Sequence, residues 1–122
     1  MHMVMFVLDD PNKLDDVLEA WNNIGVSGVT IAETTSFFRR NTQHVGARYL
    51  FGISRVSDQA EAGHFALFTV VPSIDVVDQC IAAAETIVGD LSEPNTGILT
   101  AWPLAKVKGV PSRLLNPEED RQ

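Results

Sequence analysis

The sequence predicts an α+β fold, the ferredoxin-like βαββαβ sandwich, in which a four-stranded antiparallel sheet carries two helices on one face. Three observations predict it. The chain has 122 residues and is 45% hydrophobic, which suits one domain with a single core. Two apolar runs are each followed by an amphipathic helical pattern and then by a second strand-like run. Right-handed crossovers in two such units place both helices on the same face of the sheet.

The first unit begins with the apolar run at residues 3–8, which is typical of a strand buried on both faces. Asp9-Asp10-Pro11-Asn12 follows and contains residues that cap helices. Apolar side chains then recur at the helical spacing i, i+3, i+4 and i+7: Leu14, Val17, Leu18 and Trp21. Gly25 ends this helix, because glycine adopts a left-handed conformation without strain. Alternation over residues 28–35 predicts the second strand.

The second unit repeats this order. Residues 65–71 are rich in strand formers and are followed by Ser73, which can cap a helix. The second helical stripe consists of Val76, Val77, Cys80, Ile81, Ala84 and Ile87. Gly89 ends the helix, and residues 98–104 form the fourth strand. Because Pro103 has no N–H to donate, this strand is expected to lie at an edge of the sheet or to end there.

The two units together predict one domain over residues 1–110, with a C-terminal tail at 111–122. The helices cover only one face of the sheet, yet the strands carry apolar residues on both alternations. An antiparallel sheet that faces water on one side alternates more cleanly between apolar and polar residues. The second face is therefore expected to be buried against other subunits of an oligomer.

The composition narrows the functional classes. A formal net charge of −7 argues against a nucleic-acid binder, because phosphate backbones favour positive surfaces. The single cysteine, Cys80, excludes an intramolecular disulfide and fits a reducing compartment. No stretch approaches the roughly 20 apolar residues of a membrane helix, and the opening run is too short for a signal peptide core. We expect a cytoplasmic protein that meets a membrane only indirectly, through a partner.

A long connection at residues 36–63 separates the two units. It contains only two acidic residues but four arginines, namely Arg39, Arg40, Arg48 and Arg55, whereas the rest of the chain is strongly acidic. Connections of this length without structure of their own are usually functional or disordered. Arginine suits phosphate or carboxylate, although these residues could merely keep a loop soluble. The second candidate loop, residues 89–97, carries two glycines that let the backbone approach a ligand.

Four separate segments of the chain resemble the PII nitrogen-regulatory superfamily. They read Lys13-Leu14-Asp15-Asp16-Val17, Gly25-Val26-Ser27-Gly28-Val29-Thr30, Val70-Val71-Pro72 and Asp75-Val76-Val77-Asp78-Gln79-Cys80. The similarity runs over residues 4–108, apart from the long connection. It implies a homotrimer that binds adenine nucleotides in clefts between subunits. It also implies a signalling loop after the second strand, here residues 39–62, that contacts a transporter or an enzyme.

The resemblance also implies a ligand site. Ser36-Phe37-Phe38-Arg39-Arg40 stands where the family has Gly-Phe-Gly-Arg-Gln, and residues 89–97 stand where it has a phosphate-wrapping segment. The ligand-binding residues that we predict are Ser36, Phe37, Arg39, Arg40, Gly89, Asp90, Gly97, Ile98 and Lys106. Ile98 replaces the family's lysine, and Gly109 and Pro111 replace paired arginines. We therefore expect weak binding of an anionic effector, with AMP or ADP competing well against ATP, and no required cofactor.

Other functions remain open at this point. Gly46-Ala47-Arg48-Tyr49 is similar to the stretch that carries a modified tyrosine in some PII proteins. A CutA-like metal-binding trimer shares the architecture, but His2, His44 and His64 show no metal-ligand spacing. His64 and Cys80 could meet only in space. A small ferredoxin-fold oxygenase or isomerase is a further alternative, yet no acid–base pair is readable, so we expect no enzyme.

Overall fold

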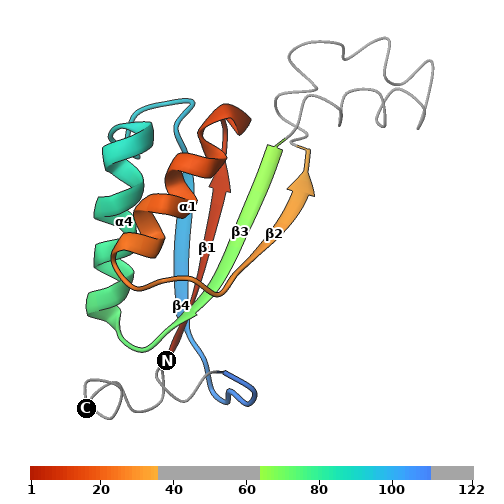
Figure 1. The fold of residues 1–122 in the computed structure, drawn as a ribbon, viewed down its shortest axis with the longest axis vertical. Helices are drawn as coiled ribbons and strands as arrows, with labels where there is room; N and C mark the ends of the chain where they lie inside the picture. Colours follow the sequence, from red (N-terminus) through yellow and green to blue (C-terminus); the bar gives the residue numbers. More distant parts are fainter. Residues whose placement is uncertain (36–63, 111–122) are drawn as a thin grey trace, which may run out of the picture.

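The computed structural model describes residues 1–35 and 64–110. Its elements, in chain order, are β1 (His2–Leu8), the 3-10 turn η1 (Pro11–Lys13), α1 (Leu14–Asn23), β2 (Val29–Thr34), β3 (His64–Val71), α4 (Ile74–Val88) and β4 (Gly97–Pro103) (Figure 1). The strands form one sheet in the order β2-β3-β1-β4, and each neighbouring pair is antiparallel. This order confirms the predicted ferredoxin-like fold. The predicted signalling loop and the tail lie outside the described residues.

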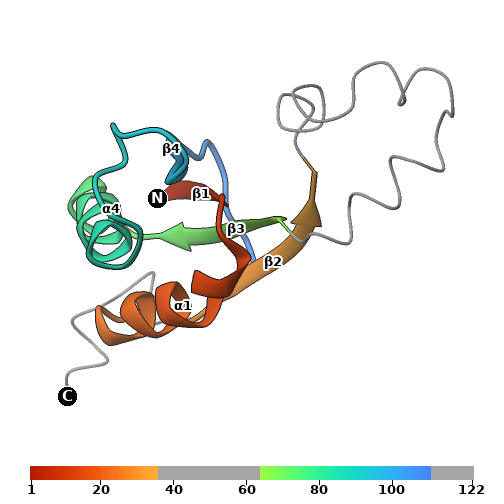
Figure 2. The ribbon, with the colours of Figure 1, turned by 90° about the horizontal axis from the view of Figure 1, so that it is seen from above.

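Both helices lie on one face of the sheet, and they pack against each other (Figure 2). The core between helices and sheet is formed by alternate residues of β1, namely Val4, Phe6 and Leu8, all fully buried. From the helix side, Trp21 closes this core: its ring lies 6.1 Å from that of Phe6, and its indole N–H donates to the Cys80 carbonyl at 3.1 Å. The bond satisfies the only polar group of a side chain that is otherwise apolar.

The helix boundaries have the local causes that the sequence suggests. The Ser73 hydroxyl accepts a hydrogen bond from the Val76 amide at 3.4 Å, so Ser73 caps α4 as predicted. The Asp10 carboxylate accepts from the Asn12 amide at 3.0 Å and caps the short turn η1 rather than α1 itself. Gly25 follows the end of α1 with a φ of +93°, a conformation that a side chain would strain.

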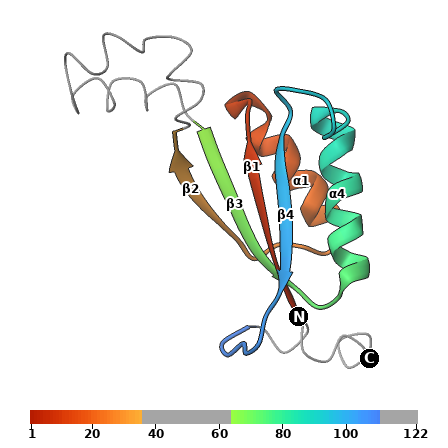
Figure 3. The same cartoon turned by 180° about the vertical axis from the view of Figure 1, so that it is seen from behind.

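The other face of the sheet carries no helix (Figure 3). Directly paired residues of antiparallel strands share a face, so the register assigns this surface. We call it the open face; its apolar members are Met3, Met5, Val7, Ala32, Ala66, Phe68, Val70, Ile98 and Trp102. Ile98 and Trp102 leave 64% and 40% of their surface exposed. The strands are therefore apolar on both faces, as the sequence predicts.

The two edges of the sheet are β2 and β4. β4 ends at Pro103, which agrees with the prediction that this proline lies on an edge strand or at its end. Within the described ranges, neither helix is long and apolar enough to cross a membrane.

Candidate functional site

The predicted site has three parts: the segment that follows β2, the loop that follows α4, and Lys106. The first two lie at the same end of the sheet. β2 ends at Thr34, and the α4–β4 loop, residues 89–96, lies at the same end (Figure 1). Lys106 follows β4 and lies at the opposite end, where the Leu104 amide donates to the Met1 carbonyl at 2.9 Å. Ser36, Phe37, Arg39 and Arg40 were predicted to bind the ligand and lie outside the described residues, as does Tyr49.

A single chain does not bring these parts together. β2 and β4 are opposite edges of a four-stranded sheet, so the exit of β2 and the α4–β4 loop are separated by three strand spacings, about 14 Å. Lys106 is farther still, because β4 spans the length of the sheet, roughly 20 Å for its seven residues. A ligand that contacts all three parts therefore needs residues from more than one copy.

The α4–β4 loop is held by two carboxylates, Glu85 in the last turn of α4 and Asp90 in the loop itself. Gly89 ends α4 with a φ of +90° and donates its amide to the Glu85 carbonyl at 3.0 Å. Two backbone amides farther along the loop donate to side chains. The Leu91 amide donates to Glu85 Oε2 and the Ser92 amide to Asp90 Oδ1, both at 2.9 Å. The Ser92 hydroxyl also donates to Asp90 Oδ1, at 2.6 Å. The Glu93 amide donates to the Asp90 carbonyl at 2.9 Å. Three successive amides are thus already engaged within the loop.

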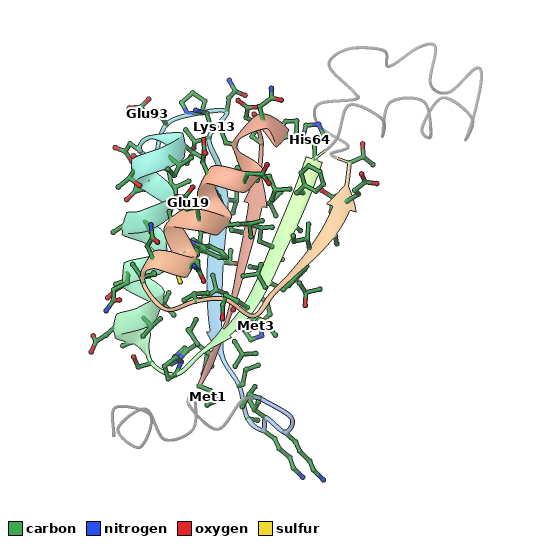
Figure 4. The ribbon with its side chains drawn as sticks, viewed as in Figure 1. Met1, Met3, Lys13, Glu19, His64 and Glu93 are labelled. Atoms are coloured by element: carbon green, nitrogen blue, oxygen red, sulfur yellow. The ribbon has the colours of Figure 1, made fainter. Side chains whose placement is uncertain are left out.

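The end of the molecule that holds the α4–β4 loop carries several acidic side chains, among them Glu85, Asp90 and Glu93. The hydroxyl and then the amide of Ser92 hold the pKa of Asp90 below its usual value, so this exposed carboxylate is charged near neutral pH. The described residues include eleven acidic side chains but only three lysines, Lys13, Lys106 and Lys108. Of these, Lys13 lies near the loop and Glu93, whereas Met1 marks the opposite end (Figure 4). The Lys13 ammonium donates to the Ile87 carbonyl at 3.3 Å, at the C-terminal turn of α4.

The two glycines of the loop have structural roles. Gly89 terminates α4. Gly97 has a φ of +134°, and a Cβ at this position would stand 2.6 Å from the Val7 carbonyl oxygen and 2.8 Å from the Phe6 ring. Glycine is therefore required for β4 to begin alongside β1. Ile98 comes next and presents its side chain on the open face, opposite Val7. Whether these residues also touch a ligand stays a prediction.

The remaining sequence candidates do not form a chemical site. His64 belongs to the open-face alternation of β3, whereas Cys80 lies in the core on the other side of the sheet, so the two do not meet. Burial raises the pKa of the Cys80 thiol to about 11, which keeps it protonated and unreactive near neutral pH. In residues 1–35 and 64–110, no three His, Cys, Asp or Glu side chains are grouped to hold a metal ion.

Glu85 and Lys13 are the two residues near the loop that the sequence analysis missed. Glu85 stands on α4 four residues before Gly89, at a position where a charged residue usually faces solvent. Its bond to Leu91 depends on the path of the loop after the helix, which no spacing reveals. Lys13 lies in one of the family-like segments, but nothing in its spacing indicates that it contacts the end of the second helix.

Comparison with known proteins supports the resemblance stated above. No family model matches the chain. Among curated proteins, the nitrogen regulatory protein P-II of Haemophilus influenzae is 39% identical over 77 residues. The match spans 60% of this chain and 60% of that relative, so it leaves more than a third of each uncovered. This match confirms the predicted resemblance to the PII superfamily.

Proposed function

We propose that this divergent PII-like regulatory protein is a cytoplasmic homotrimer that binds an anionic small molecule, an adenine nucleotide in the first place, between its subunits. We further propose that residues 39–62 transmit the bound state to a target, a transporter or an enzyme. One observation supports a ligand site between subunits of this PII-like chain. The exit of β2, the α4–β4 loop and Lys106 lie at separate edges and ends of one sheet. A second copy is needed to complete such a site.

The open face supports the trimer. It joins apolar side chains from all four strands, and two of them, Ile98 and Trp102, are exposed in the single chain. Contiguous apolar surfaces of this kind mark sites of association. A chain of 122 residues also gains from association, because a small domain buries a limited share of its surface alone. Packing of open faces around an axis would cover these side chains in every copy.

Arg39, Arg40 and Lys106 could supply the positive charge for an anionic ligand at the junction between copies. The described surface near the α4–β4 loop is acidic, so positive charge must reach the ligand from elsewhere. The sequence places Arg39 and Arg40 shortly after β2, and Lys106 follows β4. In the proposed trimer, the arginines of one copy and Lys106 of the next hold the anion. Guanidinium groups suit a phosphate because they donate two parallel hydrogen bonds.

Calorimetry with AMP, ADP and ATP tests the proposal. We expect weak binding to the full chain, and a loss of about one to two decades in affinity in Arg39→Ala or Arg40→Ala, because each removes a charge-assisted contact. Arg121→Ala, which removes one positive charge from the C-terminal tail, is the matched control and should change affinity less than twofold. If none of the three nucleotides binds at millimolar concentration, the proposed ligand is wrong.

A further inference from the structure

We propose that Glu85 and Asp90 make the α4–β4 loop a selectivity element that disfavours polyphosphates, so that the site takes a nucleoside monophosphate in preference to a triphosphate. The inference rests on the proposed nucleotide site between subunits and names the ligand class of that site. It is carried by the hydrogen bonds of the loop and by the charges around it, all of which belong to described residues.

The backbone amides of the loop that could bind a phosphate already have acceptors. A loop that wraps a phosphate binds it with successive N–H groups. Here the amides of Leu91 and Ser92 already donate to the carboxylates of Glu85 and Asp90, each at 2.9 Å, and the Glu93 amide donates to a backbone carbonyl at 2.9 Å. An incoming phosphate must displace a charged acceptor at each of the first two positions. Such charge-assisted bonds are about twice as strong as neutral ones, so the exchange brings little gain.

The charge around the loop is negative. The loop begins at the C-terminus of α4, a helix of 15 residues, where the partial charge of the helix is negative. Glu85, Asp90 and Glu93 add three carboxylates, and the nearby Lys13 ammonium is already bonded to the Ile87 carbonyl. Each further phosphate on a ligand therefore adds repulsion at this loop. A monophosphate meets less of this repulsion, because it brings fewer negative charges to the loop than a triphosphate does.

Glu85 and Asp90 are the two carboxylates that bond to amides of the loop. Glu85 is half-buried and reaches forward from the helix to an amide six residues later. Asp90 accepts from both the amide and the hydroxyl of Ser92. Glu93 takes part in the loop through its backbone, which donates to Asp90 and accepts from the Thr96 hydroxyl. Glu93 therefore offers a control that removes a charge from the loop at a residue whose recorded bonds there are made by its backbone.

The test compares AMP and ATP affinities by calorimetry in the wild-type chain, in Glu85→Gln/Asp90→Asn and in the control Glu93→Gln. Both substitutions in the double variant keep an oxygen that can accept the same amide, so the loop is expected to keep its path. The ratio of the ATP to the AMP dissociation constant should exceed one in the wild type. It should fall by about tenfold in the double variant, the order expected for two charges acting through partly screened water. In Glu93→Gln it should fall less than threefold.

A nuclear magnetic resonance titration separates the possible failures. In the wild type, ATP should leave the Leu91 and Ser92 amide resonances unshifted, whereas in Glu85→Ala/Asp90→Ala it should shift both. An unchanged affinity ratio in the double variant, or large wild-type shifts of these amides with ATP, would overturn the inference while leaving the nucleotide site intact. If the wild type binds AMP and only the variants bind ATP, both the inference and the nucleotide proposal stand. If no form binds either nucleotide, both are wrong.

Discussion

Gly97 is the residue whose substitution the structure constrains most directly. A Cβ there would stand 2.6 Å from the Val7 carbonyl, which belongs to the backbone of a central strand and cannot move aside cheaply. Gly97→Ala should therefore lower the free energy of unfolding by about 1–3 kcal/mol, measured by denaturant titration. Gly28→Ala is the matched control, because nothing lies within 4 Å of its Cβ position and its φ is not positive. Equal effects at the two glycines would contradict this account of the β4 start.

Cys80 gives a prediction for alkaline pH. Burial in the core raises the pKa of its thiol from 9.0 to about 11 in the folded state. The unfolded chain therefore loses this proton first, and the stabilisation is fully present below pH 9 and is lost as pH rises from about 9 to about 11. The free energy of unfolding should fall across this window more steeply in the wild type than in Cys80→Ala. Identical slopes would show that the thiol is not desolvated in the core.

At the scale of single elements, α4 depends on a cap that the sequence identifies. The Ser73 hydroxyl accepts from the Val76 amide, one of the N-terminal amides that lack a helical partner. Ser73→Ala should cost about 1 kcal/mol of unfolding free energy in a thermal or denaturant melt. Thr86→Ala is a suitable control on the same helix, since the Thr86 hydroxyl makes an exposed bond to Ala83 and alanine favours the helix. A larger loss at Thr86 than at Ser73 would rule out this role of the cap.

The elements could be predicted because their patterns are local. The helical spacing around Trp21 correctly predicted which side of α1 faces the core. Pro103 correctly predicted where β4 ends. Neither prediction needed information about neighbouring elements. The loop after α4 was different. Its glycines suggested an approach to a ligand, whereas the structure explains them by a helix end and by a close approach to β1. The bond from Leu91 to Glu85 was not predictable, because it depends on how the chain turns after Gly89.

At the scale of the whole molecule, the sheet determines which residues can cooperate. The separation of β2 from β4 places the predicted ligand residues at different edges, and the register places Met3, Val7 and Trp102 together on the open face. The same architecture therefore leaves both an incomplete site and an uncovered apolar surface. Association of copies would resolve both at once, which is why the oligomeric state is the central claim of the account.

Sedimentation equilibrium of the full chain at micromolar concentration tests this claim most directly. We expect a species of about 40 kDa, three copies of the 13.4 kDa chain. Trp102→Asp introduces a charge on the open face while leaving the core untouched, so this variant should sediment as a smaller species and still show a folded circular dichroism spectrum. A wild-type chain that remains a stable monomer at micromolar concentration would contradict the account.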